Sequence, residues 1–156
     1  MKLSHFGFIL IFLLCITSIN ATHIDEISKD DLKDIKYFNN NSNISLEAFN
    51  FTIPKGFGLI ENESINHTEG NYTNLERFFA NDDGKIIMIS ASSIVRQDLT
   101  LSDYTPSDVD MNRYAIKGHD GIEWSMNNAT YFIYFDSGYL ITVEAPENSY
   151  FEGIIQ

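Results

Sequence analysis

The stretch TYFIYFDSGYLITVEA, residues 130–145, decides the fold. Its two apolar halves, residues 130–135 and 139–145, are separated by residues 136–138, whose composition is typical of a tight turn. Both halves carry apolar side chains at odd and at even positions, so both faces of each strand need cover. We therefore predict two adjacent antiparallel strands at the centre of a sheet, with further structure packed above and below them.

Other apolar runs outside this stretch predict the rest of the sheet. Residues 49–53 alternate between apolar and polar side chains, which is the period of a half-buried strand. The step from Asp83 to Gly84 is a strong hairpin signal, because glycine accepts the positive φ that a two-residue turn requires. Further strands are expected at residues 57–60, 75–80, 85–94, 114–117 and 122–126, with turns at 81–84, 118–121 and 127–129.

The elements that pack on the two faces of the sheet are predicted to be helices. Phe151, Ile154 and Ile155 have helical spacing, which suits a terminal helix with one apolar face. The apolar residues of 24–38 also fall roughly on one face, and residues 98–113 are expected to form a loop with short helical turns. The sequence thus predicts the α+β class: an antiparallel sheet of about six strands with helices packed on its faces.

The first 21 residues have the order of a secretory signal peptide. Lys2 gives a basic start, residues 6–16 are almost wholly apolar, and the segment ends on Ala21. The apolar run is shorter than the ~20 residues that cross a bilayer, which favours cleavage over retention as an anchor. We expect a signal peptide at 1–21, a helical and Asn-rich tether at 22–43, and one domain at 44–156. The mature protein is predicted to be secreted or held at the cell surface.

The net charge limits the kinds of partner that the mature protein can bind, and the cysteine content limits its disulfides. The formal net charge is −12, and Lys2 is the only charged residue of the leader, so cleavage makes the protein one unit more negative. Such a surface repels nucleic acid and anionic lipid and favours cationic partners. Cys15, the only cysteine, lies in the leader, so the mature domain is expected to have no disulfide.

Many asparagines stand in the acceptor pattern for N-linked sugar. Three of them fall in the polar segment 61–74, which we interpret as a surface loop. An asparagine-rich chain also produces this tripeptide by chance, so both glycosylated and bare asparagines remain open. After the leader, the pattern occurs at Asn40, Asn43, Asn50, Asn62, Asn66, Asn71 and Asn128.

Two groups of acidic residues are candidate sites. Glu123 and Asp136 lie near strands that are expected to be neighbours, and two carboxylates can serve a hydrolase. Asp108, Asp110 and Asn112 stand at alternate positions, as oxygen ligands of calcium do. That second pattern departs from a calcium-binding loop, since Arg113 stands where glycine is needed and His119 where a glutamate should close the shell.

The histidines and aromatic residues give no stronger indication of a functional site than the acidic residues do. His23, His67 and His119 lack metal-ligand spacing and are expected in solvated segments. Trp124 and the tyrosines would form a platform for sugars or a partner if they were exposed together. We favour a core role for them, because strand aromatics are usually buried. The tyrosines in question are Tyr72, Tyr104, Tyr114, Tyr131, Tyr134, Tyr139 and Tyr150.

A set of short motifs carries a family resemblance. They are FTIPKGF at 51–57, Lys117 and Gly118 with Gly121, residues 139–143, and the ending at 151–155. With these, residues 49–156 resemble small secreted domains with the PsbP/Mog1-type fold, especially exported proteins of methanogenic archaea. The resemblance implies an antiparallel sheet between helices and an accessory or binding role, and it transfers no functional residue.

The sequence therefore favours a secreted or cell-surface, non-catalytic binding domain, whose partner is an envelope protein or glycan. It assigns no catalytic residue and no cofactor, and it leaves open whether a metal binds. One alternative is an extracellular hydrolase that uses carboxylates such as Glu123 and Asp136. Another is a surface module stabilised by calcium at residues 108–112.

Overall fold

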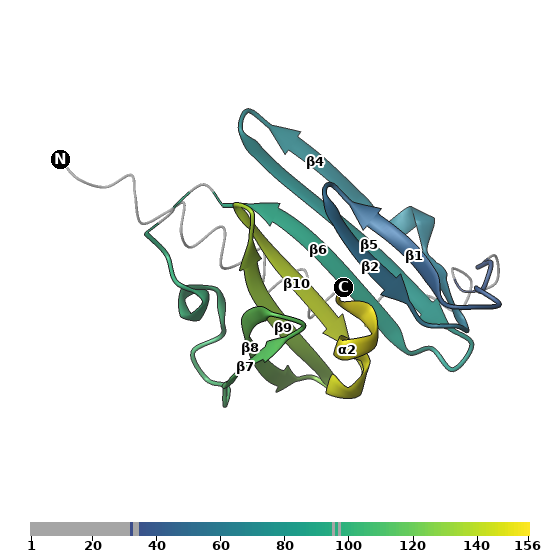
Figure 1. The fold of residues 1–156 in the computed structure, drawn as a ribbon. Coiled ribbons are helices and arrows are strands. Elements are labelled where there is room, and N and C mark those ends of the chain that lie inside the picture. The colour runs from purple at the N-terminus through teal and green to yellow at the C-terminus, as the bar shows by residue number, and fades with distance from the viewer. Residues whose placement is uncertain (1–31, 33–34, 95, 97) are drawn as a thin grey trace.

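The structure is a computed structural model that describes residues 32, 35–94, 96 and 98–156. Its main element is an eight-stranded antiparallel sheet with the order β3-β5-β6-β10-β9-β8-β7, in which β4 also pairs with β5 (Figure 1). The strands are β3 (Phe57–Leu59), β4 (Ile65–Glu69), β5 (Tyr72–Asn81), β6 (Ile86–Ser93), β7 (Asn112–Ile116), β8 (His119–Met126), β9 (Ala129–Asp136) and β10 (Tyr139–Ala145). The strands β1 (Ser42–Leu46) and β2 (Phe49–Ile53) form a separate antiparallel hairpin.

The prediction that the final two strands are central is confirmed, since β10 lies between β6 and β9, and β9 between β10 and β8. The predicted hairpin of β5 and β6 is also confirmed, and Gly84 in its turn has φ +76. The turns between β7, β8, β9 and β10 each contain two residues with positive φ, at 117–118, 127–128 and 137–138. Such turns match the twist of the paired strands. The turn expected at 118–121 is therefore shorter, because His119 already belongs to β8.

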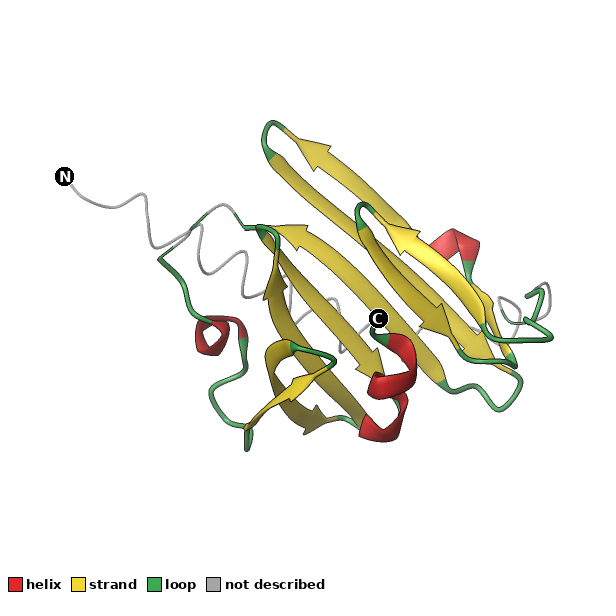
Figure 2. Cartoon of the chain, viewed as in Figure 1, coloured by secondary structure: helices red, strands yellow, loops and turns green. Residues whose placement is uncertain are grey.

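The predicted α+β class, with helices packed on the faces of a sheet of about six strands, is wrong. Within the described part of the chain, the helical elements are the four-residue α2 (Phe151–Ile154) and the short 3-10 helices η1 (Glu61–Glu63), η2 (Leu101–Tyr104) and η3 (Asn148–Tyr150) (Figure 2). The sheet is larger than expected, and a β-hairpin and irregular segments do most of the covering. The structure is thus predominantly β.

Two mostly polar segments account for the strands that the sequence did not predict. Residues 42–43 resembled a polar linker but belong to β1, where Ile44 and Leu46 turn toward the interior while the side chains between them are exposed. The segment expected as a polar loop at 61–74 contains β4, which pairs with the start of β5 through a turn at Gly70. Because β4 is almost entirely exposed, it shows little of the hydrophobic alternation that marks a buried strand.

The main core lies between the sheet and the β1–β2 hairpin; we call this side of the sheet the first face. Phe51 of β2 forms an isolated antiparallel bridge with Ile155, so the chain end is fixed against the hairpin. Phe151 and Ile154 of α2 are fully buried there, which confirms the predicted apolar spacing of the terminal helix. The core includes Leu46, Phe49, Phe51, Ile53, Phe57, Phe79, Ile87, Ile89, Phe132, Ile141, Val143, Phe151, Ile154 and Ile155.

The opposite side, the second face, carries two smaller apolar clusters. Leu99, Leu101 and Val109, from the segment that links β6 to β7, pack on a cluster that includes Trp124 and Tyr131. Leu32 and Ile35 pack on a cluster formed by Ile60, Phe78, Ala80 and Met88. Irregular segments therefore cover this face, where helices had been predicted.

Several sequence predictions lie outside the described residues. These are the signal peptide at 1–21 with Cys15, His23, and most of the helical part of the tether. Within the residues that are described, no helix has the length and apolar character needed to span a membrane.

Candidate functional site

The structure does not bring Glu123 and Asp136 together. Glu123 on β8 is opposite Phe132 on β9, and Asp136 lies four residues farther along β9. At about 3.3 Å per residue, this separates their Cα positions by roughly 13 Å along the sheet. Glu123 is buried, and its Oε2 accepts a hydrogen bond from the Tyr114 hydroxyl. The two carboxylates thus have separate surroundings, which gives no support to a shared hydrolytic centre.

Asp136 is paired with a histidine instead. Its Oδ2 lies 3.7 Å from Nδ1 of His119, and the His119 ring contacts the Tyr134 ring at a centroid distance of 4.4 Å. Nε2 of His119 lies 3.3 Å from the backbone oxygen of Gln156. Both ring nitrogens of His119 therefore have neighbours that fix the ring in place. His67 on β4 is exposed, as expected, and lies 3.8 Å from Glu69.

The candidate calcium ligands do not converge. Asp108 and Asp110 are exposed in the segment before β7, and Asn112 begins β7 opposite Glu123. The Asp108 carboxylate accepts a hydrogen bond from the Ser107 hydroxyl. No group of three or more metal-type side chains comes together within the described ranges.

The aromatic residues do not form an exposed platform. Trp124, Tyr104, Tyr131 and Tyr134 are buried, and Tyr72, Tyr139 and Tyr150 are partly buried. Tyr114 on β7 is exposed, with 38% of its surface accessible. The interpretation of most strand aromatics as core residues is therefore correct, and Tyr114 is the exception.

The β7 edge is a candidate interaction surface. β7 pairs with β8 on one side and is the last strand in the sheet order. Four of its five side chains are exposed, and no backbone hydrogen bond links it to a described residue outside its pairing with β8. Met111 and Tyr114 are two of the three exposed large hydrophobic residues in the described chain. An open strand of this kind can accept an added strand.

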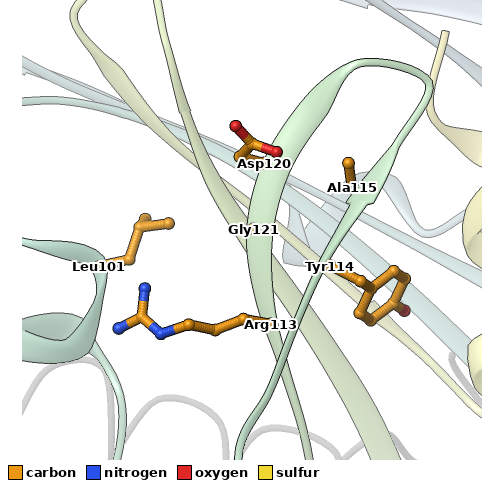
Figure 3. Close-up of a pocket in the computed structure, with 6 residues that line it drawn as sticks. All are labelled: Leu101, Arg113, Tyr114, Ala115, Asp120 and Gly121. Atoms are coloured by element: carbon orange, nitrogen blue, oxygen red, sulfur yellow. The ribbon is translucent and has the colours of Figure 1, made fainter.

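A shallow pocket of about 300 Å³ lies beside this edge (Figure 3). Figure 3 shows the Arg113 side chain directed toward Leu101 of η2, with Tyr114 on the other side of the strand. Nη2 of Arg113 donates a hydrogen bond to the Ser102 hydroxyl, so η2 and β7 share the wall of the pocket. Its lining residues are Leu101, Arg113, Tyr114, Ala115, Asp120 and Gly121.

A second unusual feature is buried on the second face. Glu144 on β10 is 1% exposed, and neither carboxylate oxygen has a hydrogen-bond partner. Burial raises the pKa of Glu144 to about 7, and the interaction of its carboxylate with the Tyr131 side chain partly offsets this rise. Nε1 of Trp124 is likewise buried without a partner. Unpaired buried polar atoms are uncommon in folded proteins.

The sequence pattern places Trp124 and Tyr131 in the core, and it does not single out Glu144. One signal was available: Glu144 follows Val143 in a strand whose two faces are both apolar. A carboxylate in that position has to enter a buried face, although acidic residues in strands usually point to solvent.

The seven asparagines in the glycosylation pattern that lie within the described residues are exposed. Three lie in or just before the β1–β2 hairpin, and three lie between β3 and the start of β5. The seventh, Asn128, lies in the turn between β8 and β9. The pattern does not occur in β7.

Comparison with known proteins gives one match. The model of a protein family described as a domain of unknown function (DUF4367) matches residues 49–155. No curated protein and no solved structure matches the chain.

Proposed function

Since the chain belongs to the DUF4367 family, whose description names no activity, we propose a function from its own sequence and geometry. It is an exported, non-catalytic domain at the cell surface that binds a protein of the cell envelope by strand addition at the β7 edge. The observation that carries this proposal is the exposed, unpaired edge of β7 beside a pocket.

Four sequence features support action outside the cell. Residues 1–21 have the order of an export signal, and no cysteine follows Cys15. The net charge of −12 suits a soluble domain that avoids nucleic acid and anionic lipid. Seven exposed acceptor asparagines fit a surface that carries sugar when the source has the transferase.

The position of the acceptor asparagines also supports β7 as the free edge. Six of the seven lie on the β1–β2 hairpin or along the segment from η1 to β5, and β4 lies at the opposite edge of the sheet from β7 (Figure 1). Bulky glycans at those sites would leave the β7 edge open. A partner strand would therefore meet less steric hindrance at β7 than at β4.

The chemistry of the edge favours a protein partner over a glycan. A glycan platform needs several aromatic faces exposed together, whereas Trp124 is buried and Tyr114 is the single aromatic residue of β7. An extended polypeptide would gain main-chain hydrogen bonds along residues 112–116 and place one side chain in the pocket next to Arg113 and Asp120. The acidic charge of the domain favours a basic partner.

Site-specific crosslinking tests this proposal. A photoreactive amino acid replaces Ala115, which is exposed on β7, and in a matched variant it replaces Thr68, which is exposed on β4. The two variants are irradiated in cells of the source organism or in its envelope extract, and the adducts are identified by mass spectrometry. We expect a discrete adduct with an envelope protein from position 115 and none from position 68.

The same experiment has outcomes that would contradict the proposal. Equal adducts from both positions, or none from position 115, would argue against β7 as the contact edge. An adduct with carbohydrate would show that the partner is a glycan and not a protein. Sequencing the N-terminus of the exported protein tests the other half of the proposal, because cleavage after Ala21 leaves Thr22 as the first residue.

A further inference from the structure

Arg113 and Ala115 carry the free backbone groups of the β7 edge. β7 and β8 are joined by a two-residue turn at 117–118, and Ile116 is directly opposite His119 across it. In such a hairpin the closing pair is hydrogen-bonded, and bonded and non-bonded pairs then alternate along the strands. Every second residue of β7, counted back from Ile116, therefore bonds to β8. Arg113 and Ala115 lie between these residues and direct their N–H and C=O groups away from β8.

The side chains of Arg113 and Ala115 lie on the second face, beside the pocket. Ala115 is directly opposite Asp120 of β8, so both side chains project from this face. The side chain of Ala115 is a single methyl group and Asp120 is exposed, so the Asp120 carboxylate can be reached from the open side of β7. Within the described part of the chain, this carboxylate makes no hydrogen bond or ion pair.

Arg113 is not paired with Asp120 of its own chain. Its side chain is directed toward Leu101 of η2 (Figure 3), and its Nη2 donates a hydrogen bond to the Ser102 hydroxyl. A guanidinium has five N–H donors, and this bond lies at the exposed surface, where water can replace it at small cost. One face of the edge thus presents a guanidinium and a carboxylate that do not neutralise each other.

The β7 edge is complementary to itself in one register. When a second copy of β7 lies antiparallel to the first with the two Tyr114 residues opposite each other, Arg113 is opposite Ala115 of the second copy. Asp120 of the second copy is next in the same row, because it is opposite Ala115 within its own hairpin. In this register the outward-directed backbone groups of Arg113 bond to those of Ala115 in the other copy.

The Arg113 side chain is long enough to reach Asp120 across this junction. With about 4.8 Å between neighbouring strands, the two Cα atoms lie about 10 Å apart. At roughly 1.2 Å of reach per bond, the six bonds of arginine and the three of aspartate span about 11 Å, and a hydrogen bond adds about 3 Å. The two groups can therefore meet above the methyl group of Ala115, and a two-fold axis repeats the pair.

The exposed aromatic residue of the edge fits the same register. Tyr114 is 38% exposed and lies on the first face. In the dimer it is opposite Tyr114 of the second copy in a non-hydrogen-bonded pair, where side chains approach most closely. The aromatic pair removes part of each ring from water. An uncovered edge strand is otherwise a site of aggregation, so a free protein benefits from covering it.

We propose that the protein, in the absence of another partner, forms a two-fold dimer in which β7 pairs with β7 of a second copy. The pairing is centred on Tyr114 and is held by two ion pairs between Arg113 and Asp120. It rests on the proposed function, since both use β7 as an accepting edge, and it adds that a second copy occupies this edge until an envelope strand displaces it.

The dimer is expected to be weak. β7 contributes five residues from each copy, which makes a small interface of the transient class. Each copy also carries a net charge of −12, so the copies repel one another, although salt at physiological ionic strength screens this repulsion beyond about 8 Å. Dilution therefore frees the edge for another strand.

Sedimentation velocity of the purified exported protein, with no partner added, tests the dimer. The protein concentration runs from about 5 µM to about 500 µM, which covers association through a small interface. We expect monomer at the lowest concentration and a growing fraction of dimer toward the highest.

A charge exchange tests the register. Arg113→Asp and Asp120→Arg are each expected to weaken dimerisation at least about tenfold, because like charges then meet across the junction. The two substitutions combined in one chain restore opposite charges, and the dissociation constant is expected to return to within about threefold of the natural value. Glu69→Arg, at an exposed position on β4, makes the same charge change as Asp120→Arg and is expected to leave the dimer intact.

Circular dichroism checks that each variant is folded. The proposal is overturned if the natural protein stays monomeric at every concentration, if either folded single variant dimerises as tightly as the natural protein, or if the combined variant stays as weak as the single ones. A monomeric protein would leave the envelope contact at β7 untouched. The absence of an envelope adduct from position 115 would leave the dimer untouched, so the two proposals can fail separately.

Discussion

The hydroxyl of Tyr114 on the edge strand β7 donates a hydrogen bond to Oε2 of the buried Glu123 on β8. The contact attaches the open edge to the body of the sheet, and the Tyr114 ring also lies 5.3 Å from the ring of Phe132. The edge strand is therefore held by a side-chain contact as well as by its backbone pairing.

Tyr114→Phe removes this donor and keeps the ring. Because Glu123 is then left buried without that partner, we expect the free energy of unfolding to fall by about 1–3 kcal/mol. Urea denaturation followed by circular dichroism measures it, with Tyr37→Phe at another exposed tyrosine as the control. A Tyr114→Phe variant as stable as the natural chain would show that the contact contributes nothing to holding β7.

Gly121 in β8 is required by close packing. A Cβ at this position would lie 2.3 Å from Cζ of Phe132 and 2.5 Å from the backbone oxygen of Ile133. We expect Gly121→Ala to destabilise the fold by about 1–3 kcal/mol, since the Ile133 backbone has to move. Gly153→Ala is the matched control, because a Cβ there meets nothing within 4 Å. Thermal unfolding of the two variants compares them, and equal melting temperatures would contradict the packing around β8.

Glu144 gives the protein a pH-dependent stability. Its pKa is about 7 in the folded chain and 4.5 in the unfolded reference, so the folded state holds a proton that the unfolded state has lost between these values. Its contribution to stability therefore decreases as the pH rises from about 4.5 to 7, by about 3 kcal/mol in total.

Glu144→Gln removes this dependence. The variant should be more stable than the natural chain at pH 8 and nearly equal to it at pH 4.5, as measured by urea denaturation at both values. Glu76→Gln, at a buried carboxylate that accepts a hydrogen bond from Asn74, serves as the control. A difference between Glu144→Gln and the natural chain that stays the same at both pH values would contradict a titrating Glu144.

The accessible asparagines give a prediction about modification. Asn71 follows the positive-φ turn at Gly70 and is exposed. In a source with the transferase, we expect peptide mass spectrometry to find sugar at Asn71 and to lose it in Asn71→Gln, with little change in stability. If the Asn71 peptide of the exported protein never carried sugar, a glycan at Asn71 could not be used to argue that access to the β4–β5 hairpin is hindered.

The sequence predicted those parts of the fold whose pattern is governed by burial on both sides. Residues 130–145 could be placed at the centre because their side chains are apolar at successive positions, and the hairpin at Gly84 was marked by its turn chemistry. β1 and β4 were missed because most of their side chains face solvent, so asparagine and serine resembled a linker. The helical cover was wrong because a β-hairpin can bury the same apolar face.

The candidate sites were harder to predict from the sequence than the fold was. Glu123 stands between Ile122 and Trp124 without a local sign of burial, but Tyr114 of β7 covers it, and that long-range contact has no local signature. The β7 edge depends on the order of the strands, which follows from the long connection between β6 and β7. The likeness to the PsbP/Mog1 fold stays a prediction.

The most direct test of the central claim is amide hydrogen exchange of the full chain with and without the envelope partner captured from position 115. We predict slower exchange at residues 112–116 in the complex, because strand addition supplies acceptors for the free backbone N–H groups of β7, and unchanged exchange at residues 65–69 of β4. Unchanged exchange in β7, or protection confined to other strands, would contradict the account.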